Sequence, residues 1–128
     1  MKTAPAPARV LVAEGDPGAR AYFECVLGAE PYDVTVVPDG EQAVELLRAG
    51  RPFDLVITGL SLPGKNGLDV ICAARNWLPM TPTLLLTSSE PPPEVTDVAL
   101  WFKSEVREKP ILPDQLKFVV RRLLEAAR

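Results

Sequence analysis

The sequence has no histidine and only two cysteines among its 128 residues. Cys25 and Cys72 are far apart in the chain, form no Cys-x-x-Cys pair and have no histidine to complete a zinc site. We therefore expect two reduced and partly buried thiols within helices. We also expect no metal site and no cofactor.

Long apolar runs are missing too, since Leu84 to Leu86 is typical of the longest and roughly 20 apolar residues are needed to span a bilayer. Residues 1–8 lack the apolar segment of a secretory signal, so we expect a short, mobile tail there. Its two prolines should make the tail locally stiff. These absences predict a soluble, cytoplasmic protein with no membrane partner.

The chain also lacks a basic stripe. Acidic and basic residues are mixed along it, and the formal net charge is −3. Proteins that bind nucleic acid usually gather lysine and arginine on one face to neutralise phosphates. The charge pattern therefore argues against direct nucleic-acid binding.

What the sequence does contain is an alternation of short β-branched runs with longer segments of helical period. This pattern is typical of a parallel sheet with crossover helices. Five such units fill residues 9–128, which we interpret as one domain. The predicted fold class is α/β, a doubly wound five-stranded parallel sheet of order 2-1-3-4-5 with helices on both faces. The predicted strands are 10–13, 33–37, 55–58, 83–87 and a very short one around 106–107.

The fourth helix is expected to be short or remodelled. Proline can begin a helix but disrupts its interior, so Pro91-Pro92-Pro93 forces a late start. Leu100 and Trp101 then fall outside the inward-facing stripe and are expected to be exposed. The inward-facing residues are predicted to be Val95, Val98, Ala99 and Phe102.

Polar and turn residues follow the predicted strands at a recurring set of positions. Function in a doubly wound sheet gathers at the carboxyl ends of the strands, where these residues fall. The pieces are Glu14-Gly15-Asp16-Pro17 with Arg20, Asp39-Gly40, Thr58-Gly59 with Pro63-Gly64 and Asn66-Gly67, Leu86-Thr87, and Lys109-Pro110.

In order and spacing these pieces resemble the receiver domain of two-component response regulators, over roughly residues 9–126. The resemblance implies a flavodoxin-like receiver fold. It also implies an acidic pair after the first strand, a phosphoacceptor aspartate ending the third, a hydroxyl after the fourth and a lysine after the fifth. In such a site a carboxylate accepts a phosphoryl group with the help of Mg²⁺, the hydroxyl and the lysine.

Three positions depart from this pattern. Gly59 stands at the phosphoacceptor position and offers no side chain to phosphorylate. Gly15 replaces the second acid, which would bind the metal, so we expect no appreciable Mg²⁺ site. Val106 stands at the aromatic switch position, and its stiff side chain cannot swing as a tyrosine does. We interpret the chain as an atypical, degenerate pseudo-receiver.

Thr87 and Lys109 match the family, but neither has a phosphoryl group to contact, and we interpret them as structural groups. A partly buried lysine needs a counter-charge, and Glu14 and Asp16 are the candidates. No residue is assigned a catalytic role. The degenerate pocket comprises Glu14, Gly15, Asp16, Gly59, Thr87 and Lys109.

The leading hypothesis is a non-enzymatic, phosphorylation-independent interaction module. Its expected partner is another signalling protein, such as a histidine kinase, regulator or output protein, or a second copy of itself. An exposed tryptophan is a suitable anchor, because aromatic residues dominate interface hot spots. The candidate surface holds Leu100, Trp101, Arg107, Gln115 and Lys117.

Two alternatives belong to other classes. The crevice at the strand ends could bind a nucleotide or flavin, although the sequence has neither a Gly-x-Gly-x-x-Gly motif nor a P-loop. Phosphotransfer could instead use Asp54, Ser61 or Thr58. Asp54 precedes its strand, however, and the hydroxyls lack an evident base to activate them.

Overall fold

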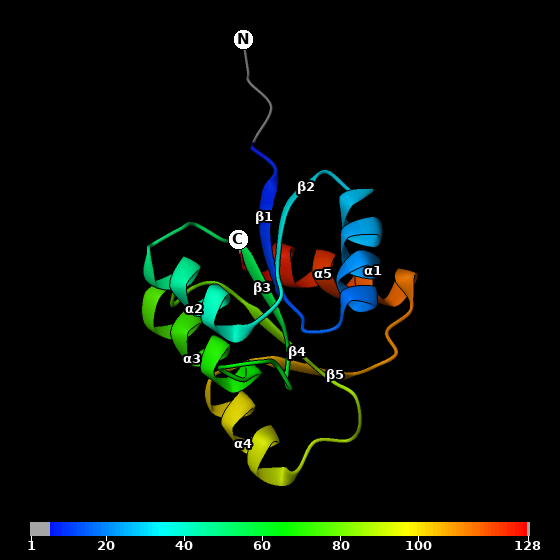
Figure 1. The fold of residues 1–128 in the computed structure, drawn as a ribbon. Coiled ribbons are helices and arrows are strands. Elements are labelled where there is room, and N and C mark those ends of the chain that lie inside the picture. The colour runs from blue at the N-terminus through cyan, green and yellow to red at the C-terminus, as the bar shows by residue number, and fades with distance from the viewer. Residues whose placement is uncertain (1–5, 128) are drawn as a thin grey trace.

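The computed structural model describes residues 6–127 of the chain. Its centre is a five-stranded parallel sheet of order β2-β1-β3-β4-β5, which confirms the predicted topology (Figure 1). The strands are β1 (Ala8–Ala13), β2 (Tyr32–Val37), β3 (Leu55–Gly59), β4 (Thr83–Thr87) and β5 (Glu105–Glu108).

Five helices connect the strands and cover both faces of the sheet. α1 and α5 share one apolar core with the sheet, while α2, α3 and α4 pack on the other face. The helices are α1 (Pro17–Gly28), α2 (Gly40–Arg48), α3 (Gly67–Trp77), α4 (Pro93–Trp101) and α5 (Pro113–Ala126). Within residues 6–127, none of them is both long and apolar enough to cross a membrane.

The three central strands are buried on both faces, which explains why they read as unbroken apolar runs rather than alternating ones. Val10, Leu11, Leu55, Val56 and Ile57 are completely buried. This buried sheet holds the strand ends in fixed positions, and the loops that follow them carry the candidate site.

Side-chain caps fix where the helices begin. Asp16 accepts a hydrogen bond from the Ala19 amide over 2.8 Å, and Asp39 does the same for the Gln42 amide. Each cap satisfies one of the amides that the first helical turn leaves unpaired. The loops after β1 and β2 therefore end at defined points.

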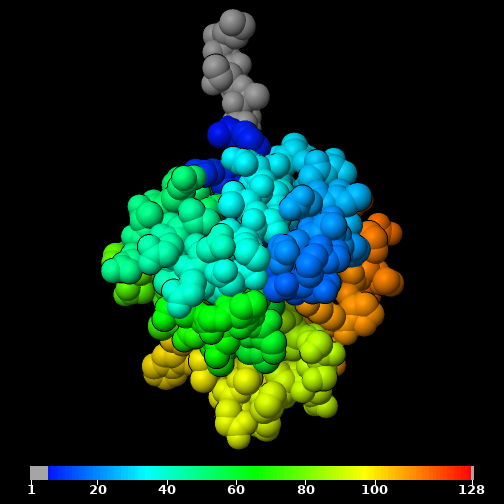
Figure 2. Space-filling view, viewed as in Figure 1, coloured from blue at the N-terminus to red at the C-terminus, as the bar shows by residue number. Residues whose placement is uncertain are grey.

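The fourth helix has nine residues and begins at Pro93, as the proline run predicted. Together with the segment before it, it forms one end of the molecule (Figure 2, yellow). Val98 was predicted to face inward but is 38% exposed. At 100° per residue, Val95, Ala99 and Phe102 already cover the arc that faces the sheet, and Val98 lies at its margin.

The predicted N-terminal tail, residues 1–8, overlaps the first strand by one residue. β1 begins at Ala8, one residue before the predicted domain boundary, because Ala8 pairs with Tyr32 of β2. Residues 1–5 of the predicted tail lie outside the described residues.

Cys25 and Cys72 are exposed, so the prediction of partly buried thiols was wrong. Both lie on solvent-facing sides of their helices, next to the buried stripes.

Candidate functional site

Four predicted site residues come together at the carboxyl ends of the strands. Glu14 follows β1, Gly59 ends β3, Thr87 ends β4 and Lys109 follows β5. The parallel register aligns these ends, since Gly59 pairs with Leu86 and Thr87 with Glu108. The sheet therefore gathers side chains that are up to 95 residues apart in sequence.

The centre of the site is an ion pair between Lys109 and Glu14. The Lys109 ammonium donates to Oε2 of Glu14 over 2.7 Å, and the Asp16 amide donates to Oε1 over 3.3 Å. Glu14 is only 4% exposed. A buried carboxylate needs such partners, because desolvating it without them is costly. Of the two predicted counter-charges, Glu14 is the one that pairs with Lys109.

The Glu14 carboxylate lies directly against Gly59. A Cβ atom at residue 59 would be 3.2 Å from Glu14 Oε2 and 3.7 Å from Cδ2 of Leu62. A Cβ at Gly15 would be 3.1 Å from Cδ of Pro63. Both glycines thus border packed atoms, and the glycine at 59 leaves Glu14 the space in which it meets Lys109.

The donor set at this site does not fit Mg²⁺, which prefers free carboxylate oxygens in octahedral geometry. Both oxygens of Glu14 already accept hydrogen bonds, and Asp16 caps α1. The Arg20 guanidinium also donates to the backbone carbonyls of Glu14 and Gly15, each over 3.0 Å, and so places a cation beside this loop. In the described part of the chain, no three or more His, Cys, Asp or Glu residues form a metal-binding group.

Thr87 is the unusual polar residue of the site. It is 2% exposed, and its Oγ1 has no hydrogen-bond partner within residues 6–127. Thr58, also buried, instead donates to the Gly59 carbonyl over 2.9 Å. Buried hydroxyls are normally paired, so the Thr87 hydroxyl calls for an explanation.

A pocket of about 210 Å³ borders Thr87 and Lys109. Sites that hold drug-sized ligands typically measure about 300–1,000 Å³, so this pocket does not favour a nucleotide or flavin. Its lining is Gly59, Leu60, Ser61, Leu86, Thr87, Ser88, Ser89, Glu90, Pro91, Pro92 and Lys109.

Val106, at the predicted switch position, is partly buried. It packs against a cluster formed by Ile71, Leu85 and Ala99, which joins α3, β4 and α4. Its side chain therefore contributes to the core beneath α4.

Only some side chains of the predicted interaction surface are free to contact a partner. Leu100 and Trp101 are 73% and 82% exposed, as expected from their place outside the α4 stripe. Arg107 pairs with Glu105 over 2.7 Å, and Gln115 accepts from the Leu112 amide at the start of α5. Lys117 is half-buried. The two apolar residues are thus the most accessible members.

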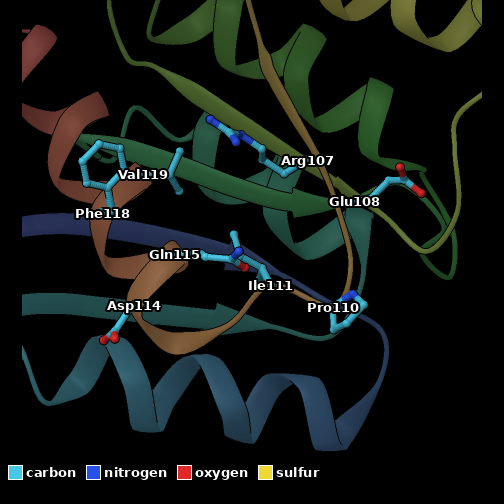
Figure 3. Close-up of a pocket in the computed structure, with 8 residues that line it drawn as sticks. All are labelled: Arg107, Glu108, Pro110, Ile111, Asp114, Gln115, Phe118 and Val119. Carbon is cyan, nitrogen blue, oxygen red and sulfur yellow. The ribbon is translucent and has the colours of Figure 1, made fainter.

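Sequence reasoning missed two exposed apolar side chains next to this surface. Phe118 is 66% exposed and Leu112 is 57% exposed. Phe118 lies outside the apolar stripe of α5, a signal that could have identified it. Phe118 borders a groove of about 540 Å³ where β5 leads into α5 (Figure 3). The other lining residues are Arg107, Glu108, Pro110, Ile111, Asp114, Gln115 and Val119.

The chain is similar in sequence to known proteins. The chain is 36% identical to the DNA-binding response regulator MtrA of Mycolicibacterium smegmatis over 116 residues, which are 88% of the chain and 49% of that protein. The chain thus spans about half the length of such curated relatives.

Two solved structures resemble the fold closely. One is a response regulator receiver protein from Sinorhizobium medicae, with a TM-score of 0.86, 27% identity and coverage of 95% of this chain and 98% of that one. The other is the chemotaxis protein CheY4 of Vibrio cholerae, with a TM-score of 0.82, 26% identity and coverage of 92% and 99%.

The family profile described as response regulator receiver domain matches residues 10–121, most of the sheet and all five helices at least in part. The match includes every strand end that forms the site described above. The chain belongs to the response regulator receiver domain family.

Proposed function

We propose that this receiver domain is a phosphorylation-independent interaction module, a degenerate member of its family. The observation that carries the proposal is the glycine at the end of β3, where the family pattern has its phosphoacceptor aspartate. Gly59 has no atom that could form an acyl phosphate.

The ion pair beside Gly59 supports the proposal. In the phosphoryl-transfer site implied by the family, the lysine contacts the acceptor and the transferred group. Here Lys109 contacts Glu14 over 2.7 Å. A carboxylate from the loop after β1 thus serves as the internal partner of the lysine, and the site is held together without a phosphoryl group.

Receiver domains of this family act by contacting histidine kinases and output domains. We propose that this one contacts another signalling protein or a second copy of itself, through the surface that carries Leu100 and Trp101. Curated relatives are DNA-binding response regulators as whole proteins, whereas this chain matches about half of their length. DNA contact is not proposed for the domain itself, and neither is enzymatic activity.

Treatment with acetyl phosphate and Mg²⁺ tests the first part of the proposal. The intact mass of the protein should remain unchanged, while a receiver domain with an aspartate at the end of β3, treated in parallel, should gain one phosphoryl group. A stoichiometric gain on this chain would overturn the proposal. Peptide mapping would then show whether Asp54, Ser61 or Thr58 is the acceptor.

Capture experiments with purified candidate kinases and output proteins test the second part. The wild type and Lys109→Ala should retain a partner that Trp101→Ala loses. Sedimentation of the same three proteins tests self-association. Equal retention or equal self-association by all three would contradict a role for this surface.

A further inference from the structure

The pocket beside Thr87 is lined by groups of opposite charge. Its lining includes Thr87, whose hydroxyl can donate a hydrogen bond, and Lys109, whose ammonium can donate three. Glu90 adds a carboxylate to the lining from an exposed position. Ser61, Ser88 and Ser89 supply further hydroxyl groups to the lining. The lining therefore offers both hydrogen-bond donors and a negatively charged acceptor.

The Thr87 hydroxyl is the feature that indicates ligand binding. It is buried and lacks a partner within the described residues. Leaving such a group unsatisfied costs about 1–3 kcal/mol. Lys109 also has capacity to spare, because an ammonium carries three N–H donors and its hydrogen bond within residues 6–127 goes to Glu14.

Charge restricts what can bind there. Lys109 is already balanced by Glu14, and Arg20, which is not part of the pocket lining, donates to the backbone carbonyls of Glu14 and Gly15. Glu90 adds a negative charge without an ion-pair partner among the described residues. A dianion such as phosphate would meet net repulsion in this setting, and so would a simple carboxylate.

A molecule that carries both a carboxylate and an ammonium can pair with both kinds of lining group without adding net charge. Its carboxylate would accept from Lys109 and Thr87, and its ammonium would lie near Glu90. The volume of about 210 Å³ lies below the range of drug-sized sites and limits the molecule to a small one.

We infer that the pocket between Gly59, Thr87 and Lys109 binds a free α-amino acid with a small side chain. This inference rests on the proposed function, because a site that accepted a phosphoryl group would use Thr87 and Lys109 for that group. It gives the domain a ligand that could report to a partner without covalent modification.

A titration followed by two-dimensional ¹H–¹⁵N NMR tests the inference. Glycine and L-alanine are added separately at constant ionic strength, with acetate and inorganic phosphate as comparators. The amides of Thr87, Ser88 and Lys109 should shift saturably with the amino acids. Acetate and phosphate should bind at least about tenfold more weakly, since each lacks the ammonium that Glu90 would contact.

Variants identify the atoms responsible. Thr87→Val and Glu90→Gln should each weaken glycine binding by about tenfold, because the first removes a hydrogen-bond donor to the carboxylate and the second removes the negative charge that attracts the ammonium. Lys65→Met, which removes an exposed lysine from the loop after β3, is the matched control and should bind like the wild type. Thr87→Val keeps the shape of the side chain, so the test does not depend on variants of the buried ion pair.

Absence of saturable shifts with both amino acids would overturn the inference and leave water as the partner of Thr87. Binding of acetate or phosphate as tight as that of glycine would also overturn it. Either result is distinct from failure of the proposed function, which would appear as a gain of phosphoryl mass with acetyl phosphate.

Discussion

Lys109 and Glu14 form a 2.7 Å ion pair across the sheet, although 95 residues separate them in the chain. The Glu14 side chain is 5% exposed and that of Lys109 is 29% exposed. The two partners are therefore unequal. Removing Lys109 leaves a charge buried, whereas removing the charge of Glu14 leaves an ammonium that can still reach water.

This inequality predicts the stability of three variants. Lys109→Met should lower the free energy of unfolding by about 1–3 kcal/mol, because the Glu14 carboxylate loses its ammonium. Glu14→Gln should cost about 1 kcal/mol. The double variant should be more stable than the sum of the two losses implies, by about 0.5–3 kcal/mol. Urea unfolding at neutral pH measures all three.

Additive losses would show that the pair contributes no coupling. Arg48→Met provides a control, because Arg48 pairs with Glu45 on the exposed surface of α2, where both side chains are more than half exposed. Such pairs contribute about 0–1 kcal/mol, so this change should have little effect.

The two buried threonines should respond differently to the same change. Thr58→Val removes a hydroxyl that donates to the Gly59 carbonyl, so it should cost about 1 kcal/mol. Thr87→Val removes a buried hydroxyl without a partner in the described part of the chain, so it should be neutral or stabilise by about 1 kcal/mol. Urea unfolding of the ligand-free protein compares them.

Equal destabilisation by both substitutions would mean that the Thr87 hydroxyl is paired after all. The comparison is well matched, since both residues are buried at the ends of neighbouring strands.

The raised pKa of Tyr22 predicts a loss of stability at high pH. Burial raises the pKa of Tyr22 above its ordinary value of 10.0, and its hydroxyl donates to the Ile111 carbonyl. The folded state thus holds the phenol proton more tightly than the unfolded chain does. The contribution of Tyr22 to stability is complete below about pH 10 and is lost as the pH rises through the raised pKa.

Burial also raises the pKa of Tyr32, so the measurement is made in a Tyr32→Phe background. Adding Tyr22→Phe should reduce the loss of unfolding free energy between about pH 9 and about pH 11. An unchanged pH dependence would contradict the prediction. At neutral pH the same change should cost about 1 kcal/mol, from the hydrogen bond to Ile111.

Much of the fold was predictable because buried parallel strands and amphipathic helices leave periodic patterns that depend on sequence neighbours. The late start of α4 followed from Pro91-Pro92-Pro93. The pairing of Lys109 with an acid was also predictable, because a partly buried ammonium needs one.

Other features depend on packing between distant segments and left no local signal. Which acid pairs with Lys109 depends on the space that Gly59 leaves for Glu14. The lone Thr87 hydroxyl depends on which donors and acceptors surround β4. Exposure of Cys25 and Cys72 was mispredicted because a position within a helix does not reveal how far the neighbouring elements cover it.

The exposed Trp101 on α4 is expected to contribute little to the stability of the fold. Trp101 is 82% exposed, so Trp101→Ala should change the free energy of unfolding by no more than about 0.5 kcal/mol. Leu116→Ala, which empties a fully buried position on α5, should cost about 2–5 kcal/mol in the same urea experiment. The contrast separates a side chain that faces solvent from one that fills the core.

A loss near 2 kcal/mol for Trp101→Ala would mean that the indole covers the small cluster of Ile71, Leu85 and Ala99 beneath α4. A neutral result has a different consequence. A large apolar ring that adds nothing to folding gains free energy only when a partner removes it from water, at about 25 cal/mol for each Å² of apolar surface buried. Loss of partner binding without loss of stability would then assign Trp101 to the interface.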